Sequence, residues 1–304
     1  MATLRVTQNI LTQRVLTNLR DQNRRILDLQ TQLATGQRIN NLSDGPLGAR
    51  LAVGIRREIQ RNEQFLENIN TTSPFLQSTA TTTQTMIDVM QRTRELTLQG
   101  ANETNGPQQR AAIAQEINQL LEQTFATSNQ RTNGRFLYGG TRTRQAPFEA
   151  TRDGDGRITA VDYVGNDGAI NIAVAEGVEL RTNETGRQVF LDNQDIFQNL
   201  IDIRDDLLAG NTNDLSNLRL AEIGVAEEQL LNSLARTGAV QNRLERIDDD
   251  TRDFNFQLQE TLSNTLDADF AEVIVNLNAE SNALQAALGG AARIIQPSLL
   301  NFLS

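Results

Sequence analysis

The sequence contains no cysteine, histidine, tryptophan or lysine, so all 28 of its basic residues are arginines. Without cysteine, the chain has neither a disulfide nor a thiolate metal site. Without histidine, it lacks the commonest general base and metal ligand of proteins. Paired carboxylates are the main catalytic groups that remain. We therefore expect a protein that is not an enzyme and that binds no metal ion or cofactor.

The charge and hydropathy of the chain exclude further classes of function. A net charge of −10 over 304 residues argues against general nucleic-acid binding, which needs a basic surface. No apolar run approaches the length of a membrane span. The first residues, MATLRVTQNILTQRV, lack the apolar core and small-residue cleavage site of a secretory signal peptide. We expect a protein that stays in the cytoplasm or is exported without a cleavable signal.

The last forty residues carry an apolar stripe at heptad spacing. Asp267 or Asp269 can cap the helix that begins there, and Glu280 is the one charged member of the stripe. The apolar members are Phe270, Val273, Leu277, Leu284, Ala287, Ala291 and Ile294, with Leu288, Ile295, Leu299 and Leu300 beside them. Because a long amphipathic helix needs a partner that covers its stripe, we interpret these positions as an assembly surface.

The N-terminal segment carries a matching seam at alternating spacings of four and three residues. Its members are Val15, Leu19, Gln22, Ile26, Leu29 and Leu33. This spacing is typical of the a and d positions of a coiled coil, here with one polar member. Residues 1–38 contain six arginines and two aspartates, whereas residues 265–304 contain four acidic residues and one arginine. Opposite charges favour an antiparallel pair of the two helices, while the apolar seam supplies most of the affinity.

The middle of the chain reads as long helices interrupted by one strand-like region. A helix is predicted from Pro46 to about Gln99, with a kink or division at Pro74, and another begins at Pro107. From Gly134 to about Phe190 the sequence pattern predicts short strands, GRQVF among them, separated by Gly-rich turns.

Two helices follow the strand-like region. The first runs from Asp195 to Gly210. The second is about 50 residues long and is capped by Asp214.

The DGDG run, residues 153–156, resembles the beginning of a calcium-binding loop. That loop needs an acidic residue or asparagine and then a glycine, but Arg157 and Ile158 stand there, and Val164 occupies the position of the bidentate glutamate. A solvated hairpin turn is the better interpretation.

Folding back at the strand-like region would bring the two ends of the chain together. We predict a mainly α fold, an elongated rod of long antiparallel helices with a terminal coiled-coil pair and a small β-rich insertion domain. Residues 1–45 and 265–304 would form the terminal domain. Residues 46–137 and 191–264 would form the helical rod, and residues 138–190 the insertion.

Three segments together carry a resemblance to the flagellin superfamily. LATGQRINNLSDGPLGARLA resembles the N-terminal signature of that family, and GRFLYGGTRTRQAPF is similar to its turn from the helical core into the outer β-domain. DADFAEVIVNLNAESNALQAAL resembles its C-terminal helix. The segments stand in the family's order, and the ending SLLNFLS is most like that of proteins at the junction of hook and filament.

The resemblance implies a structural, self-assembling subunit of the extracellular bacterial flagellum that joins hook to filament through its terminal helices. Its implied partners are copies of itself, an adjoining hook-associated protein, flagellin, and an export chaperone with the type III export apparatus. A short flagellin that forms the filament itself is the nearest alternative. A secreted enzyme using Asp153 with Asp155, or Asp162 with Asp167, and a cytoplasmic coiled-coil adaptor are alternatives from other classes.

Overall fold

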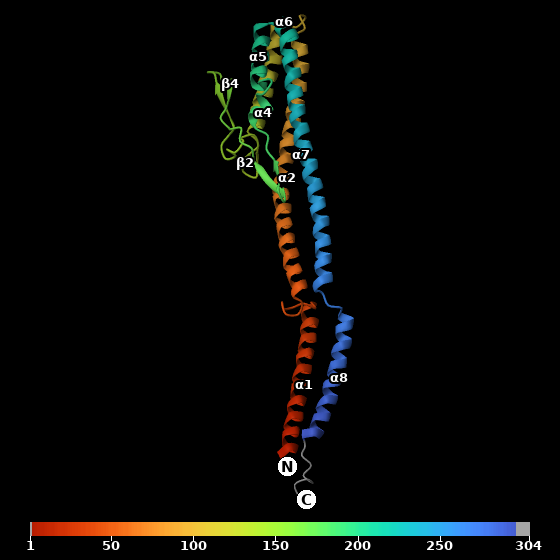
Figure 1. Ribbon diagram of the computed structural model, residues 1–304. Helices are drawn as coiled ribbons and strands as arrows, with labels where there is room; N and C mark the ends of the chain where they lie inside the picture. The colour runs from red at the N-terminus through yellow and green to blue at the C-terminus, as the bar shows by residue number, and fades with distance from the viewer. Residues whose placement is uncertain (1, 296–304) are drawn as a thin grey trace. The chain divides into compact units, whose positions relative to one another are not determined.

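The computed structural model describes residues 2–295 (Figure 1). In chain order the elements are α1 (Ala2–Thr35), α2 (Pro46–Gly100), α3 (Pro107–Ser128), β1 (Arg131–Thr132), β2 (Arg135–Phe136), β3 (Phe148–Arg152), β4 (Ile158–Tyr163), β5 (Asn171–Ala175), β6 (Val178–Arg181), α4 (Gly186–Phe190), α5 (Ile196–Ala209), α6 (Thr212–Asp214), a π-helical turn (Leu215–Arg219), α7 (Leu220–Leu266) and α8 (Phe270–Ile295). The predicted fold class is confirmed: long helices dominate, and the sheets are small and antiparallel. None of the described helices is long and apolar enough to cross a membrane.

The chain divides into two compact units. The terminal unit combines both ends of the chain, Met1–Arg61 and Asp253–Ser304, and the central unit is Asn62–Arg252. The helices α2 and α7 contribute residues to both units.

In the terminal unit α1 and α8 lie side by side (Figure 1). Gly36 ends α1 with a φ of +72°, a left-handed conformation that glycine adopts without strain. Its carbonyl accepts a hydrogen bond from the Ala268 amide at 2.9 Å, and the Arg38 amide donates to Leu266 O at 2.6 Å. These bonds tie the loop before α2 to the loop before α8, so the end of α1 and the beginning of α8 share one base.

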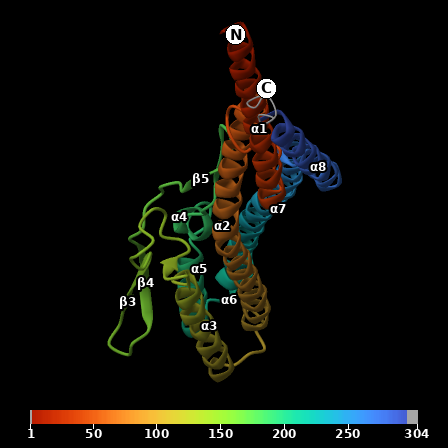
Figure 2. The ribbon, with the colours of Figure 1, turned by 90° about the horizontal axis from the view of Figure 1, so that it is seen from below.

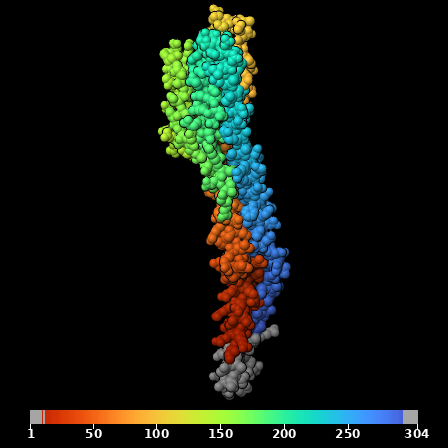
Figure 3. All heavy atoms as spheres, turned by 45° about the horizontal axis from the view of Figure 1, so that its top comes forward, coloured from red at the N-terminus to blue at the C-terminus, as the bar shows by residue number. Residues whose placement is uncertain are grey.

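The core of the molecule lies in the central unit, where α3 packs on α5 and both pack with α2 and α7. Figures 2 and 3 show the β-rich segment beside these helices on one side of that unit. Five aromatic rings join the segment to the helices. Their neighbouring centroids are 5.0–5.6 Å apart, and the rings belong to Tyr138, Phe148, Tyr163, Phe190 and Phe197. Such pairs stabilise beyond the burial of their surface, which anchors the β-rich segment.

Three antiparallel hairpins make up the β-rich segment: β1–β2, β3–β4 and β5–β6. The DGDG run forms the turn between β3 and β4, as predicted. There Asp153 Oδ1 accepts hydrogen bonds from the amides of Asp155 (3.0 Å) and Arg157 (2.8 Å). The carboxylate therefore satisfies backbone groups of its own turn.

The structure corrects three local predictions. The segment GRQVF is the short helix α4 and not a strand, because Thr185 and Gln188 form a capping box at its beginning. Asp214 lies inside a helix and caps nothing; Asn211 precedes that helix. Pro74 does not divide α2, which continues through it.

Candidate assembly surface

The predicted N-terminal seam lies along the side of α1 that faces α8. Its apolar members, all half-buried, are Val15, Leu19, Ile26, Leu29 and Leu33. Gln22, the polar member, is buried at 8% exposure.

The C-terminal stripe is covered only in part. Val273 and Ala291 are buried, whereas Leu277, Leu284 and Ala287 are half-buried. Phe270 and Leu288 are about half exposed, at 52% and 51%. Ile294 and Ile295 end α8, but their side chains lie outside the described part of the structure, as do Leu299 and Leu300 entirely. The pairing with α1 thus leaves apolar surface of α8 uncovered.

The single charge in the C-terminal stripe is paired across the two helices. Arg25 Nε donates to Glu280 Oε1 at 2.9 Å, and its NH2 group donates to Oε2 at 3.4 Å. Gln37 and Asp267 form an antiparallel bridge at the other end of the pair. Between these two contacts the residue numbers rise along α1 and fall along α8. The helices therefore run antiparallel, as expected from their charges. The Arg25 side chain is 55% exposed, so the ion pair orients the helices and adds under about 1 kcal/mol.

The α8 helix begins at the second of the two candidate caps. Asp269 Oδ1 accepts from the amides of Ala271 at 2.8 Å and Glu272 at 3.3 Å. Asp267 instead accepts from the Ser263 hydroxyl at 2.6 Å. Asp269 therefore sets the beginning of α8.

Exposed apolar side chains concentrate in the terminal unit, whereas both clusters of buried apolar residues lie in the central unit. The exposed residues of the terminal unit are Ile10, Leu16, Leu27, Leu42, Leu47, Leu51, Val53, Phe254, Phe256, Phe270, Ile274, Val275 and Leu288. Soluble monomers rarely expose so much apolar surface, and such surfaces mark sites of association. An open groove along α1 and α8, lined mainly by polar side chains such as Gln32 and Asn276, has no enclosed pocket for a small molecule.

The acidic residues that the enzyme hypothesis would use as catalytic pairs either have a structural role or are exposed. Asp153 holds its own turn, and Asp167 pairs with Arg187 at 3.0 Å. Asp155 and Asp162 are exposed. Within residues 2–295 no three acidic residues are placed to hold a metal ion. This arrangement supports no acid–base pair in a cleft.

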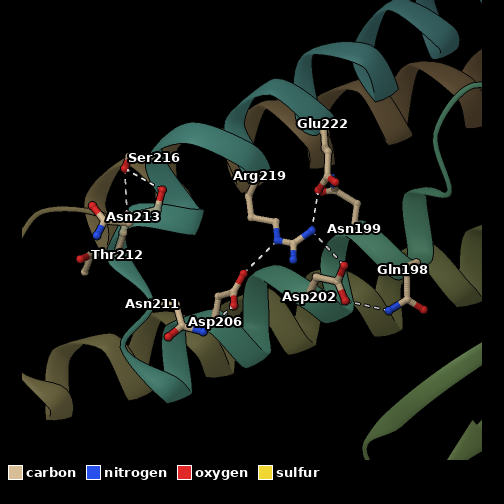
Figure 4. Close-up of polar contacts among 10 residues, drawn as sticks. All are labelled: Gln198, Asn199, Asp202, Asp206, Asn211, Thr212, Asn213, Ser216, Arg219 and Glu222. Atoms are coloured by element: carbon tan, nitrogen blue, oxygen red, sulfur yellow. Dashed lines mark hydrogen bonds and ion pairs between the residues drawn. The ribbon is translucent and has the colours of Figure 1, made fainter.

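A dense polar cluster in the central unit was not predicted from the sequence (Figure 4). At the end of the π-helical turn, the guanidinium of Arg219 contacts Asp202 (3.0 Å) and Asp206 (2.9 Å) on α5 and Glu222 (2.8 Å) on α7. Burial lowers the pKa of Arg219, but the hydrogen bonds to Asp206 and Glu222 and the charge of Asp202 outweigh it and raise the pKa. The i,i+4 spacing of Asp202 and Asp206 was the available signal; their partner required the fold.

Comparison with known proteins shows similarity to proteins of the bacterial flagellum. The model of the bacterial flagellin N-terminal helical region matches residues 6–143. The chain is 24% identical to flagellar hook-associated protein 3 of Salmonella typhimurium, over 86% of this chain and 87% of that protein. Residues 6–143 thus resemble bacterial flagellins, and most of the chain resembles flagellar hook-associated protein 3.

Two further comparisons show the same relation. Flagellin FlaB1 of Treponema pallidum is 25% identical over 70% of this chain and 69% of its own length. A solved structure of a putative flagellar hook-associated protein from Vibrio parahaemolyticus shares the fold, with a TM-score of 0.65 and 22% identity. That match covers 74% of this chain and all of the Vibrio chain. The proteins that this chain resembles are, by name, components of flagella.

Proposed function

We propose that this protein is the structural subunit that joins the hook to the filament of a bacterial flagellum. One observation carries the proposal: the terminal unit pairs α1 with α8 but leaves apolar faces of both helices exposed. Assembly would cover these faces and supply the burial that the terminal unit lacks by itself. The similarity to flagellar hook-associated protein 3 extends over most of both chains and favours a junction subunit.

The seam and stripe residues are assigned to assembly in this proposal. Those of α1 and the covered part of α8 hold the terminal pair together. Neighbouring subunits contact the other positions of the stripe, which are Phe270, Leu288, Ile294, Ile295, Leu299 and Leu300. The domain organisation follows from the same proposal: residues 1–45 and 265–304 line the inner tube, residues 46–137 and 191–264 form the next layer, and residues 138–190 face outward.

The proposed partners are copies of the chain, an adjoining hook-associated protein and flagellin. Export would proceed through the flagellar type III apparatus with a dedicated chaperone, without a cleavable signal peptide. The absence of cysteine is compatible with threading of an unfolded chain.

Deletion of the gene followed by electron microscopy tests the proposal. We expect hooks on the cells and filament material shed into the medium, because filaments would lack their attachment. Complementation with the intact gene is the control. Normal, attached filaments in the deletion strain would contradict the proposed function.

The second candidate is a short flagellin that forms the filament itself, since flagellins are also similar to this chain. Purified protein that polymerises alone into long filaments would favour that alternative. Protein that attaches to isolated hooks without propagating would favour the junction subunit.

A further inference from the structure

One exposed strip lies on the first turns of α2, within the terminal unit. Leu47 is 78% and Leu51 is 50% exposed. Arg50 and Arg57, also exposed, make no hydrogen bond or ion pair with any described residue. Gly54 stands between them, and no atom lies within 4 Å of the place where its Cβ would be. Residues at these spacings share one side of a helix. We call this set the α2 strip.

No contact within the chain requires a glycine at position 54. A glycine in a helix interior costs about 1 kcal/mol relative to alanine. Nothing in the terminal unit crowds it, so its small size serves no internal packing. A glycine on an open helix face permits close approach by a side chain from outside.

A second exposed strip lies on the last turns of α7, in the same unit. It consists of Asp253, Phe256 and Glu260, at i, i+3 and i+7 on one side of the helix. Phe256 is 69% exposed. No described residue pairs with either acidic side chain. We call this set the α7 strip.

The two strips match in charge, spacing and shape. Arg50 and Arg57 are seven residues apart, as are Asp253 and Glu260, and seven residues span about 10.5 Å of helix. A phenylalanine lies between the two acids, and a glycine beside a leucine lies between the two arginines. Placing the Phe256 ring over Gly54 would set each carboxylate opposite a guanidinium.

Within one chain the strips point away from each other. The inner sides of the two helices pack together: Ala52 and Ile55 of α2 are buried, as is Leu266 of α7. A Cβ at Gly48 would lie 3.4 Å from Thr265 Cγ2. The matching surfaces are therefore available only to a second molecule.

We propose that the α7 strip of one copy docks on the α2 strip of the next copy. Because the two surfaces differ, the contact is heterologous and repeats from subunit to subunit, which closes a ring or generates a helical array. The aromatic side chain forms the centre of the contact, and the charge pairs set its register. This inference rests on the proposed function and names a lateral contact by which the subunits assemble.

Cross-linking in a chain that has no native cysteine tests the contact. A double variant with Gly54→Cys and Phe256→Cys is expressed in the deletion strain, and isolated flagella are treated with a short bismaleimide. We expect a ladder of dimers, trimers and higher multimers, since each subunit carries both halves of a heterologous contact. The matched control is the pair Gln60→Cys and Gln259→Cys, exposed positions on the same helices beside the strips, which should give no ladder.

Each other outcome of the cross-linking decides against the proposal. Dimers formed by Gly54→Cys alone would mean that two α2 strips face each other. Absence of a ladder in flagella that contain the double variant would mean that the strips do not meet. Either result leaves the junction function intact, because that function is judged by the hooks and shed filaments of the deletion strain.

Charge reversal provides an independent test. Arg50→Glu with Arg57→Glu, and separately Asp253→Arg with Glu260→Arg, should each cause loss of incorporation and motility. The chain with all four changes carries complementary strips again and should regain both. Far-UV circular dichroism of the purified variants should match the parent, since all four positions are exposed. Failure of the fourfold variant to recover, with each pair still defective and folded, would overturn the pairing.

Discussion

Replacing Arg219 with methionine removes the one cation that three carboxylates share. The Arg219 side chain is 15% exposed, and those of Asp206 and Glu222 are 12% and 23% exposed. Methionine keeps much of the volume, so the main effect is electrostatic. Two contacts join α5 to the end of the π-helical turn, which places the loss at a helix–helix junction of the central unit.

The expected cost follows from the charges that remain. Removing one partner of a buried pair leaves uncompensated charge and destabilises by about 3–5 kcal/mol. For a unit of this size that corresponds to a fall in Tm of roughly 6–20 °C. Partial solvent access to Asp202, at 30%, favours the lower part of the range.

The tyrosines of the chain provide a spectroscopic signal for unfolding of the central unit. It has no tryptophan, and its two tyrosines, Tyr138 and Tyr163, both lie in that unit. The tyrosine band of the near-UV circular dichroism spectrum, or tyrosine fluorescence, therefore follows the central unit alone during thermal or urea unfolding. Far-UV circular dichroism follows the helices of both units.

The matched control is Arg252→Met on α7, the helix that follows the π-helical turn. Arg252 pairs with Asp248 at 2.6 Å, but its side chain is 53% exposed, so we expect little loss of stability. Adding Asp202→Asn, Asp206→Asn and Glu222→Gln to Arg219→Met should recover part of the stability, because the repelling charges are gone. Equal, small losses for Arg219→Met and Arg252→Met would refute the reasoning.

Three further predictions concern the core, pH and assembly. Phe148→Ala, at the centre of the aromatic cluster, should cost about 3–5 kcal/mol in urea unfolding; an unchanged midpoint would contradict the assigned packing. Burial raises the pKa of Tyr138, and burial with the charge of Asp167 raises that of Tyr163 to about 12. Because an unfolded tyrosine titrates near about 10, this stabilisation is complete below that pH and is lost as the pH rises toward 12. Absorbance should therefore show no tyrosinate until the protein unfolds, and tyrosinate near pH 10 in the folded chain would contradict this. Leu277→Asp places a carboxylate in the terminal seam and should abolish incorporation into flagella, since an unpaired charge there costs several kcal/mol; Asn278→Asp, exposed on α8, is the control, and normal motility of Leu277→Asp would contradict the role of the seam.

Much of the helical framework could be predicted because it is encoded locally. Gly36, Pro46, Pro107 and Gly210 mark helix ends by backbone conformation alone, and the structure places helix boundaries at each. The segment GRQVF was predicted wrongly because a β-branched and an aromatic residue suggested a strand, whereas a capping box at Thr185 decided for a helix.

The candidate assembly surface was predictable in its pattern but not in its coverage. Heptad spacing predicted which residues of α1 and α8 face each other, since periodicity fixes the side of a helix. How far α1 covers α8 depends on the distance between two helices far apart in the chain. That distance leaves Phe270 and Leu288 about half exposed.

The sequence by itself determined the long helices, their antiparallel return and the exclusion of thiol and imidazole chemistry, because composition and helical period are properties of the chain alone. Only the tertiary structure decided that Arg219 serves three carboxylates, that five aromatic rings meet, and that Gly54 and Phe256 lie on outward faces. These facts depend on which segments pack together in space, and no local periodicity encodes that placement.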